Sequence, residues 1–175
     1  AVRDVIIFPG VTVPLTVGRE KSIAALEEAG TDGFMLVVTQ KDPATEDPAP
    51  EDLFEIGTLV KILRVVDARQ QGKQALVVGI QRVQIDAFAA ESPTLRALYT
   101  ALPGEDEGID LEEPWQRVVE LAQRVVDLRE DYPDEGKAFL SGIPEPGMLA
   151  DLLASNLTLP PDEGIGLLRE TRQSE

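Results

Sequence analysis

Short apolar runs, each broken by proline, glycine or clustered acids, fill the N-terminal part of this chain and limit it to a β-rich fold. Runs of strand length lie at residues 2–8, 11–17, 34–39, 53–66, 75–80, 83–88 and 94–102. One helix is expected among them over residues 20–29, where Ile23, Leu26 and Ala29 face inward and Gly30 ends the helix. We predict a small mixed barrel or curled sheet over residues 1–103.

Proline and glycine give this sheet some expected detail. Pro14 cannot donate a ladder hydrogen bond, so its strand is expected at an edge or a crossing position. Gly72 is expected in a hairpin turn, and Gly79 in a bulge or tight bend between two strands. Residues 42–52 contain prolines and acids without a single base, which predicts a solvated loop.

The pattern changes after an acidic linker at residues 104–114. From Trp115 onward the apolar residues recur at helical spacing, and the first stripe comprises Trp115, Val118, Val119, Ala122, Val125 and Val126. Further helices are expected over 145–156 and from Pro161. The fold class predicted is therefore α+β, with a β-rich lobe at 1–103 followed by a helical lobe at 115–175.

Composition excludes most catalytic chemistry. The chain has no histidine and no cysteine, so His-based triads, His-ligated zinc, thiolate metal sites and disulfides are ruled out. No phosphate-binding G-x-x-x-x-G-K-[ST] loop occurs. The formal net charge of −16 opposes binding to nucleic acid or anionic membranes. We expect a non-catalytic cytoplasmic chain with no cofactor and no metal; the acids at 105–107 lack the spacing of a calcium loop.

Four segments carry a family resemblance: "RDVIIFPGVTVPLTVGREKSIAALEEA", "LVVTQKDPATEDPAPEDLFEIGTLVKIL", "ALVVGIQRVQI" and "PGMLADLLASNLTLP". In this order and at this spacing, the chain resembles the N-terminal domain of the Lon family of ATP-dependent bacterial serine proteases. The match is weakest over residues 103–142. In the family a long helix, an AAA+ ATPase and a Ser–Lys protease domain follow, and residues 1–175 do not include them.

The resemblance implies a PUA-like β-rich lobe followed by helices. It also implies capture of unfolded or degron-bearing proteins for delivery to the ATPase and protease, with ATP and Mg bound outside this chain and other Lon subunits as partners in a hexamer. Two alternatives remain: an assembly or gating module of that hexamer, and a stand-alone relative of the substrate-binding domain. RNA binding, known for other PUA-like folds, is disfavoured by the acidic charge.

Unfolded chains differ from folded ones in exposing apolar segments, so the expected receptor surface is shallow and apolar. Because Pro9 and Pro14 interrupt the first strands, side chains near them can remain on a rim. The candidate substrate-binding residues are Phe8, Val11, Val13, Pro14, Leu15 and Met35. The alternative is that most of them pack in the core. Arg82, between two apolar strands, is interpreted as a structural ion-pair residue.

Overall fold

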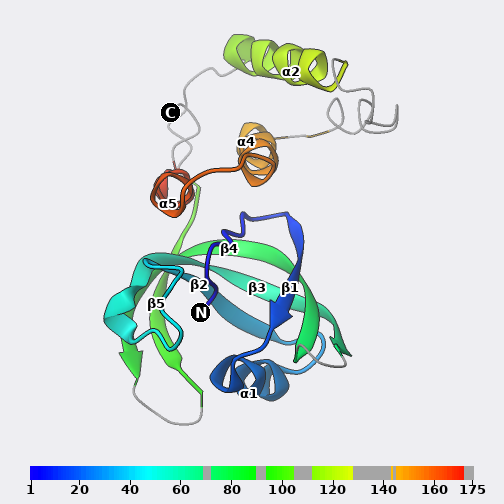
Figure 1. The fold of residues 1–175 in the computed structure, drawn as a ribbon. Coiled ribbons are helices and arrows are strands. Elements are labelled where there is room, and N and C mark those ends of the chain that lie inside the picture. Colours follow the sequence, from blue (N-terminus) through cyan, green and yellow to red (C-terminus); the bar gives the residue numbers. More distant parts are fainter. Residues whose placement is uncertain (69–71, 90–93, 105–111, 128–142, 144, 172–175) are drawn as a thin grey trace.

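A computed structural model describes all residues except 69–71, 90–93, 105–111, 128–142, 144 and 172–175 (Figure 1). The described elements follow the chain in this order: β1 (Thr12–Val17), α1 (Glu20–Ala29), β2 (Phe34–Gln40), the 3-10 turn η1 (Pro50–Asp52), β3 (Leu53–Asp67), β4 (Lys73–Ala89), β5 (Arg96–Leu102), α2 (Glu112–Asp127), α4 (Pro146–Ser155) and α5 (Pro161–Arg169). The α+β class is confirmed, with a sheet-rich part and several helices.

The strands form one five-stranded antiparallel sheet in the order β1-β4-β3-β2, and β5 also pairs with β4. Strand β4 carries β1 along Lys73–Val78 and β5 along Arg82–Ala89, while β3 pairs along its other edge. Strands β1 and β2 end this order and do not pair with each other. The sheet is therefore open, and the barrel alternative is wrong. The predicted edge position of Pro14 is confirmed.

The N-terminal segment crosses the sheet without forming a regular strand. Residues 2–8 were expected to form a strand, but they make only isolated bridges, Val2 with Thr39 and then Pro9 with Gly79. Between these bridges, hydroxyl groups take the place of a ladder: Thr39 donates to the Val5 carbonyl at 2.7 Å, and Thr58 donates to the Ile7 carbonyl at 2.6 Å. Two carbonyls of the segment thus have hydrogen-bond donors without a regular strand.

Strand β4 is continuous, where the sequence predicted two strands. The expected irregularity is present, because the β3–β4 register shifts so that Leu59 pairs with Gln81 and Val60 with Gly79, leaving Ile80 as the extra residue. A side chain at Gly79 would lie 2.2 Å from the Phe8 carbonyl oxygen. Glycine is therefore required here because the N-terminal segment crosses β4 too closely for any Cβ.

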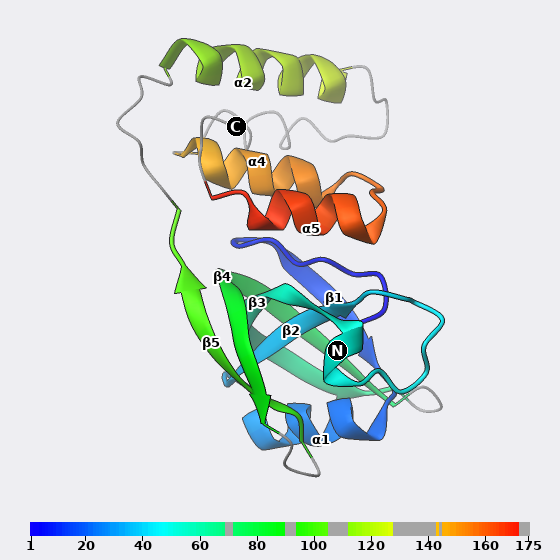
Figure 2. The same cartoon turned by 90° about the vertical axis from the view of Figure 1, so that its left-hand side faces the viewer.

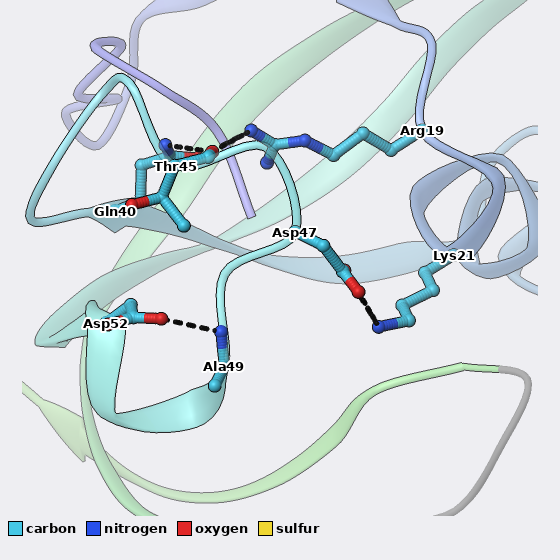
Figure 3. Close-up of polar contacts among 7 residues, drawn as sticks. All are labelled: Arg19, Lys21, Gln40, Thr45, Asp47, Ala49 and Asp52. Carbon is cyan, nitrogen blue, oxygen red and sulfur yellow. Dashed lines mark hydrogen bonds and ion pairs between the residues drawn. The ribbon is translucent and has the colours of Figure 1, made fainter.

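The acidic segment after β2 is attached to the body of the protein rather than simply solvated. Gln40 is fully buried; its amide donates to the Thr45 carbonyl at 2.9 Å, and its side-chain oxygen accepts from Arg19 at 2.7 Å. Lys21 pairs with Asp47 at 2.8 Å (Figure 3). These bonds tie the segment to the start of α1. The predicted solvated loop is exposed over most of its length, as expected, but it is anchored to the protein by these contacts.

Helix α1 lies at one end of the sheet, and α4, α5 and α2 lie at the other, with α2 farthest from the strands (Figure 1). Figure 2 shows the same order after a 90° turn. Helix α1 ends as predicted, because Gly30 adopts a φ of 69° and donates its N–H to the Leu26 carbonyl. Helix α5 packs on the N-terminal segment so closely that a Cβ at Gly164 would lie 2.3 Å from Cδ1 of Ile6.

An ion pair joins the helices to the sheet. The Arg82 guanidinium on β4 pairs with the Asp151 carboxylate on α4, and its Nε donates to the Leu168 carbonyl of α5 at 3.0 Å. Burial raises the pKa of Asp151, and the charge of Arg82 and its hydrogen bond offset part of this rise. The interpretation of Arg82 as a structural ion-pair residue is confirmed.

Helix α2 follows the predicted stripe only in part. Trp115, Val119 and Ala122 pack against the Leu149 region of α4, whereas Val118 is 41% exposed. The side chains of Val125 and Val126 lie outside the described residues. The predicted division at residues 104–114 remains a prediction, since the structure describes only part of that segment.

Candidate functional site

Two of the predicted substrate-binding residues lie inside the protein. Phe8 is 3% exposed, in a cluster with Ile56 and the α5 residues Ile165 and Leu168. Leu15 is 6% exposed, in the main core beneath the sheet. Both side chains pack in the core, as the alternative interpretation expected, and their role in substrate binding stays a prediction.

The other four predicted residues reach the surface to different degrees. Val11, Val13 and Met35 are half-buried and pack against core clusters, and Pro14 is exposed. Pro14 therefore points toward the surface that a partner could contact. Whether any of these residues binds substrate stays a prediction.

Pro14 belongs to an exposed apolar surface that the strand register assembles. Residues directly opposite each other on neighbouring strands project from the same side of a sheet. Pro14 on β1 pairs with Leu76 on β4, and Leu76 pairs with Arg64 on β3.

The neighbouring row crosses four strands from Thr12 to Val78, Lys61 and Phe34. Because side chains alternate along a strand, both rows project from the same face. A third row places Val66 beside Gln74 and Thr16.

We call the side of the sheet formed by these rows the outer sheet face. Its apolar members are Pro14, Phe34, Val66, Leu76 and Val78. Phe34 is 56% exposed, Val66 38% and Leu76 37%, whereas Val78 is partly covered. The bulged residue Ile80, 46% exposed, lies next to this face on β4. The residues occupy alternate positions on different strands, so only tertiary pairing brings them together.

The chemistry of the outer sheet face is that of a non-covalent binding surface. Its charged members are Lys61, which lies 3.5 Å from Asp32, and Arg64. Two basic side chains on the face of a strongly acidic chain can contact carboxylates or backbone carbonyls of a bound segment, beside apolar side chains that bury its hydrophobic residues. Among the described residues, no group of three or more His, Cys, Asp or Glu could hold a metal ion.

Sequence reasoning missed Phe34, Val66, Leu76 and Ile80. All four lie directly beside other apolar residues of the same strand, as in "ALVVGI" at 75–80, so alternation does not separate the inner face from the outer face. Pro14 was the available signal. The residue paired with Pro14 on the neighbouring strand projects from the same face of the sheet and is also exposed. That this residue is Leu76 can be seen only from the strand register.

Comparison with known proteins places this geometry in a family. The family model described as "ATP-dependent protease La (LON) substrate-binding domain" matches residues 1–175. The Lon protease of Desulfovibrio desulfuricans is 38% identical over 161 residues, which cover 90% of this chain and 18% of the relative. The Lon protease of Azospirillum brasilense is 37% identical over 177 residues, covering 99% of this chain and 22% of the relative. The chain thus spans about a fifth of the length of these relatives.

Solved structures agree. The N-terminal domain of Mycobacterium avium complex Lon protease matches with a TM-score of 0.77 and 26% identity, covering 99% of this chain and 89% of that one. A Lon N-terminal domain protein from Xanthomonas campestris shares the fold, with a TM-score of 0.64 at 17% identity over 96% of this chain and 86% of the other. Within the described residues, no helix is both long and apolar enough to cross a bilayer.

Proposed function

The chain belongs to the Lon substrate-binding domain family, and on this premise we propose that it captures unfolded or degron-bearing proteins through the outer sheet face. It passes them to the ATPase and protease modules of a parent Lon protease, an ATP-dependent serine endopeptidase that assembles as a hexamer in the cytoplasm. ATP and Mg bind to those other modules, and nucleic acid does not bind through this domain.

The observation that supports this proposal is the exposure of large apolar side chains in adjoining cross-strand rows. Leu76 lies on β4 and Phe34 on β2. On the opposite face of the sheet, Val60 and Ile62 of β3 and Val77 of β4 are 0% exposed, while Met35 of β2 is half-buried. The core on that face is thus formed without the side chains of Phe34 and Leu76. Apolar side chains that a fold leaves together at the surface commonly mark an interaction site.

Such a surface suits a receptor that recognises the exposed apolar side chains of unfolded proteins rather than a particular sequence. Contact with a few exposed apolar residues gives modest affinity, since binding must also offset the ordering of the captured segment. Several copies of the domain in one assembly would then hold a substrate through avidity.

A titration with a reduced and alkylated, permanently unfolded protein tests the proposal. We expect the double variant Phe34→Ser/Leu76→Ser to weaken binding by about tenfold, the loss typical of removing central apolar contacts. Gln74→Ser, on the same face of β4, is the matched control and should bind as the parent chain does. Circular dichroism shows whether each variant is folded.

Equal affinity of the double variant and the control would remove the outer sheet face from the binding site. Self-association of the parent chain that the double variant abolishes, without any effect on binding of the unfolded protein, would instead favour the assembly alternative. Size-exclusion chromatography of both variants separates these outcomes.

A further inference from the structure

A small cavity lies away from the outer sheet face, between the start of β3 and the second half of β4. Its volume is about 220 Å³. Leu53 and Ile85, which are 3% and 6% exposed, and the half-buried Phe88 provide its apolar lining. Drug-sized ligands occupy roughly 300–1,000 Å³, so this space suits a single bulky side chain.

The rim of this cavity is fixed by hydrogen bonds on the η1 side. The backbone N–H of Lys41 donates to the Asp52 carbonyl at 2.7 Å, and the Lys41 ammonium donates to the Glu51 carbonyl at 2.8 Å. The Asp52 carboxylate accepts the backbone N–H of Ala49 at 2.9 Å (Figure 3). The segment that carries Glu51 is therefore held in place before any ligand arrives.

A β-bulge shapes the opposite rim. The β4–β5 register shifts between Ile85 and Ala87, which leaves Asp86 as an extra residue. Asp86 and Ala87 are consequently exposed in succession, while Ile85 stays buried. The Asp86 carboxylate accepts a hydrogen bond from the Thr100 hydroxyl at 2.9 Å, which holds it at the rim.

The rim carries an excess of negative charge. Glu51, Glu55 and Asp86 face a single base, Lys41, whose ammonium already binds the Glu51 carbonyl. In the described part of the chain, no hydrogen bond or ion pair involves the carboxylates of Glu51 or Glu55. This cavity combines apolar side chains with polar groups and has carboxylates at its mouth, so it is complementary to an apolar side chain with a cation beside it.

We propose that this cavity binds one bulky apolar side chain of an unfolded polypeptide whose neighbouring residue is lysine or arginine. The cation contacts the carboxylates of Glu51, Glu55 and Asp86 while the apolar group lies on Leu53, Ile85 and Phe88. This inference rests on the proposed function and adds a preference to it: of two equally apolar unfolded segments, the basic one is captured more tightly.

Three unstructured peptides of equal length test the preference by fluorescence anisotropy. One carries a phenylalanine flanked by arginines, the second a phenylalanine flanked by glutamates, and the third an alanine flanked by arginines. We expect the first to bind about tenfold more tightly than either of the others, because only it matches both the cavity and the rim. Raising the salt concentration should narrow the gap between the first two peptides.

Two variants locate the binding. Ala87→Trp fills the mouth of the cavity and should reduce affinity for the first peptide by roughly tenfold. Glu55→Lys, at an exposed position where misfolding is not expected, should reduce it by about threefold to tenfold and abolish the preference over the glutamate peptide. Leu76→Ser on the outer sheet face should leave the preference unchanged.

Equal binding of the arginine and glutamate peptides, or a preference that survives Glu55→Lys, would overturn the inference. If the peptides then bind Leu76→Ser more weakly than the parent chain, capture by the outer sheet face is supported and binding in the cavity is refuted. If neither the peptides nor the unfolded protein bind the parent chain, both proposals fail.

Discussion

The sheet and the helices of this domain are stabilised in different ways. The sheet has an extensive core in which Val60, Ile62 and Val77 are completely buried, in a cluster that also contains Ile7, Leu15 and Leu26. Helix α2 instead packs on α4 through a small cluster, and Val118 and Leu121 remain 41% and 50% exposed.

This difference indicates which part depends on the other. Helices α4 and α5 bury Ile165, Leu168 and Ala154 against Phe8 and Ile56 of the sheet region. Helix α2 in turn contacts α4. The sheet thus forms the main core of the domain. Helices α4 and α5 pack on the sheet region, and α2 packs on α4. The proposed receptor surface therefore lies on the more extensively packed part of the domain, and a preorganised surface would limit the entropy lost on binding.

The largest expected effect compares two side chains of equal burial in the two regions. Ile62 and Leu149 are both 0% exposed. Ile62→Ala should lower the free energy of unfolding by about 4 kcal/mol, since the surrounding strands cannot move in to fill the cavity. Leu149→Ala should cost about 2 kcal/mol, near the lower limit for such changes, because the small helical cluster can close around the gap. Urea unfolding measures both, and equal losses would refute the contrast.

The next effect concerns the connection between the regions. Arg82→Met should destabilise the domain by about 3 kcal/mol, because it leaves the buried Asp151 carboxylate without its partner. The double variant Arg82→Met/Asp151→Leu should recover most of this loss, since no charge then remains buried. Hydrogen exchange of α4 and α5 amides should rise in the single variant while β3 amides stay protected. Uniform exchange in all elements would show that the helices do not open separately.

The smallest effect is a titration. Burial holds the pKa of Asp151 above its ordinary value of 3.8, and Arg82 lowers it in part. Because the folded pKa is the higher one, this group's contribution to stability is complete below the unfolded pKa and is lost as the pH rises through the folded pKa. Carbon-13 NMR of the Asp151 carboxyl should show the raised pKa, and a still higher one in Arg82→Met. A pKa at or below 3.8 would contradict the stated balance of burial and charge.

Local sequence signals predicted the helices and strands well where a glycine or proline restricts the backbone to one kind of structure. Gly30 ends α1, Pro14 marks the edge strand, and Pro161 begins α5. The prediction of a strand at 2–8 failed because its apolar residues lack regular neighbours to pair with, and Thr39 and Thr58 satisfy its carbonyls instead. The sequence of residues 2–8 cannot show that the hydroxyls of Thr39 and Thr58, far along the chain, donate to its carbonyls.

The exposure of individual side chains was predicted less well than the fold. Sequence patterns marked the neighbourhood of Pro14 as apolar and interrupted, but not which side chains point outward. Phe8 and Leu15 proved to be buried, and Leu76 and Phe34 proved to be exposed. In strands that are apolar at every position, the direction of each side chain depends on register and on which face another element covers.

By itself, the sequence determined the α+β class, the acidic character, the absence of histidine and cysteine chemistry, and a resemblance to Lon substrate-binding domains. These follow from composition and from local order along the chain. The tertiary structure alone decided that the sheet stays open, that Arg82 joins it to the helices, and that Pro14, Leu76 and Phe34 share one exposed face. The physical reason is that burial and pairing join residues tens of positions apart, and such contacts leave no periodic trace in the sequence.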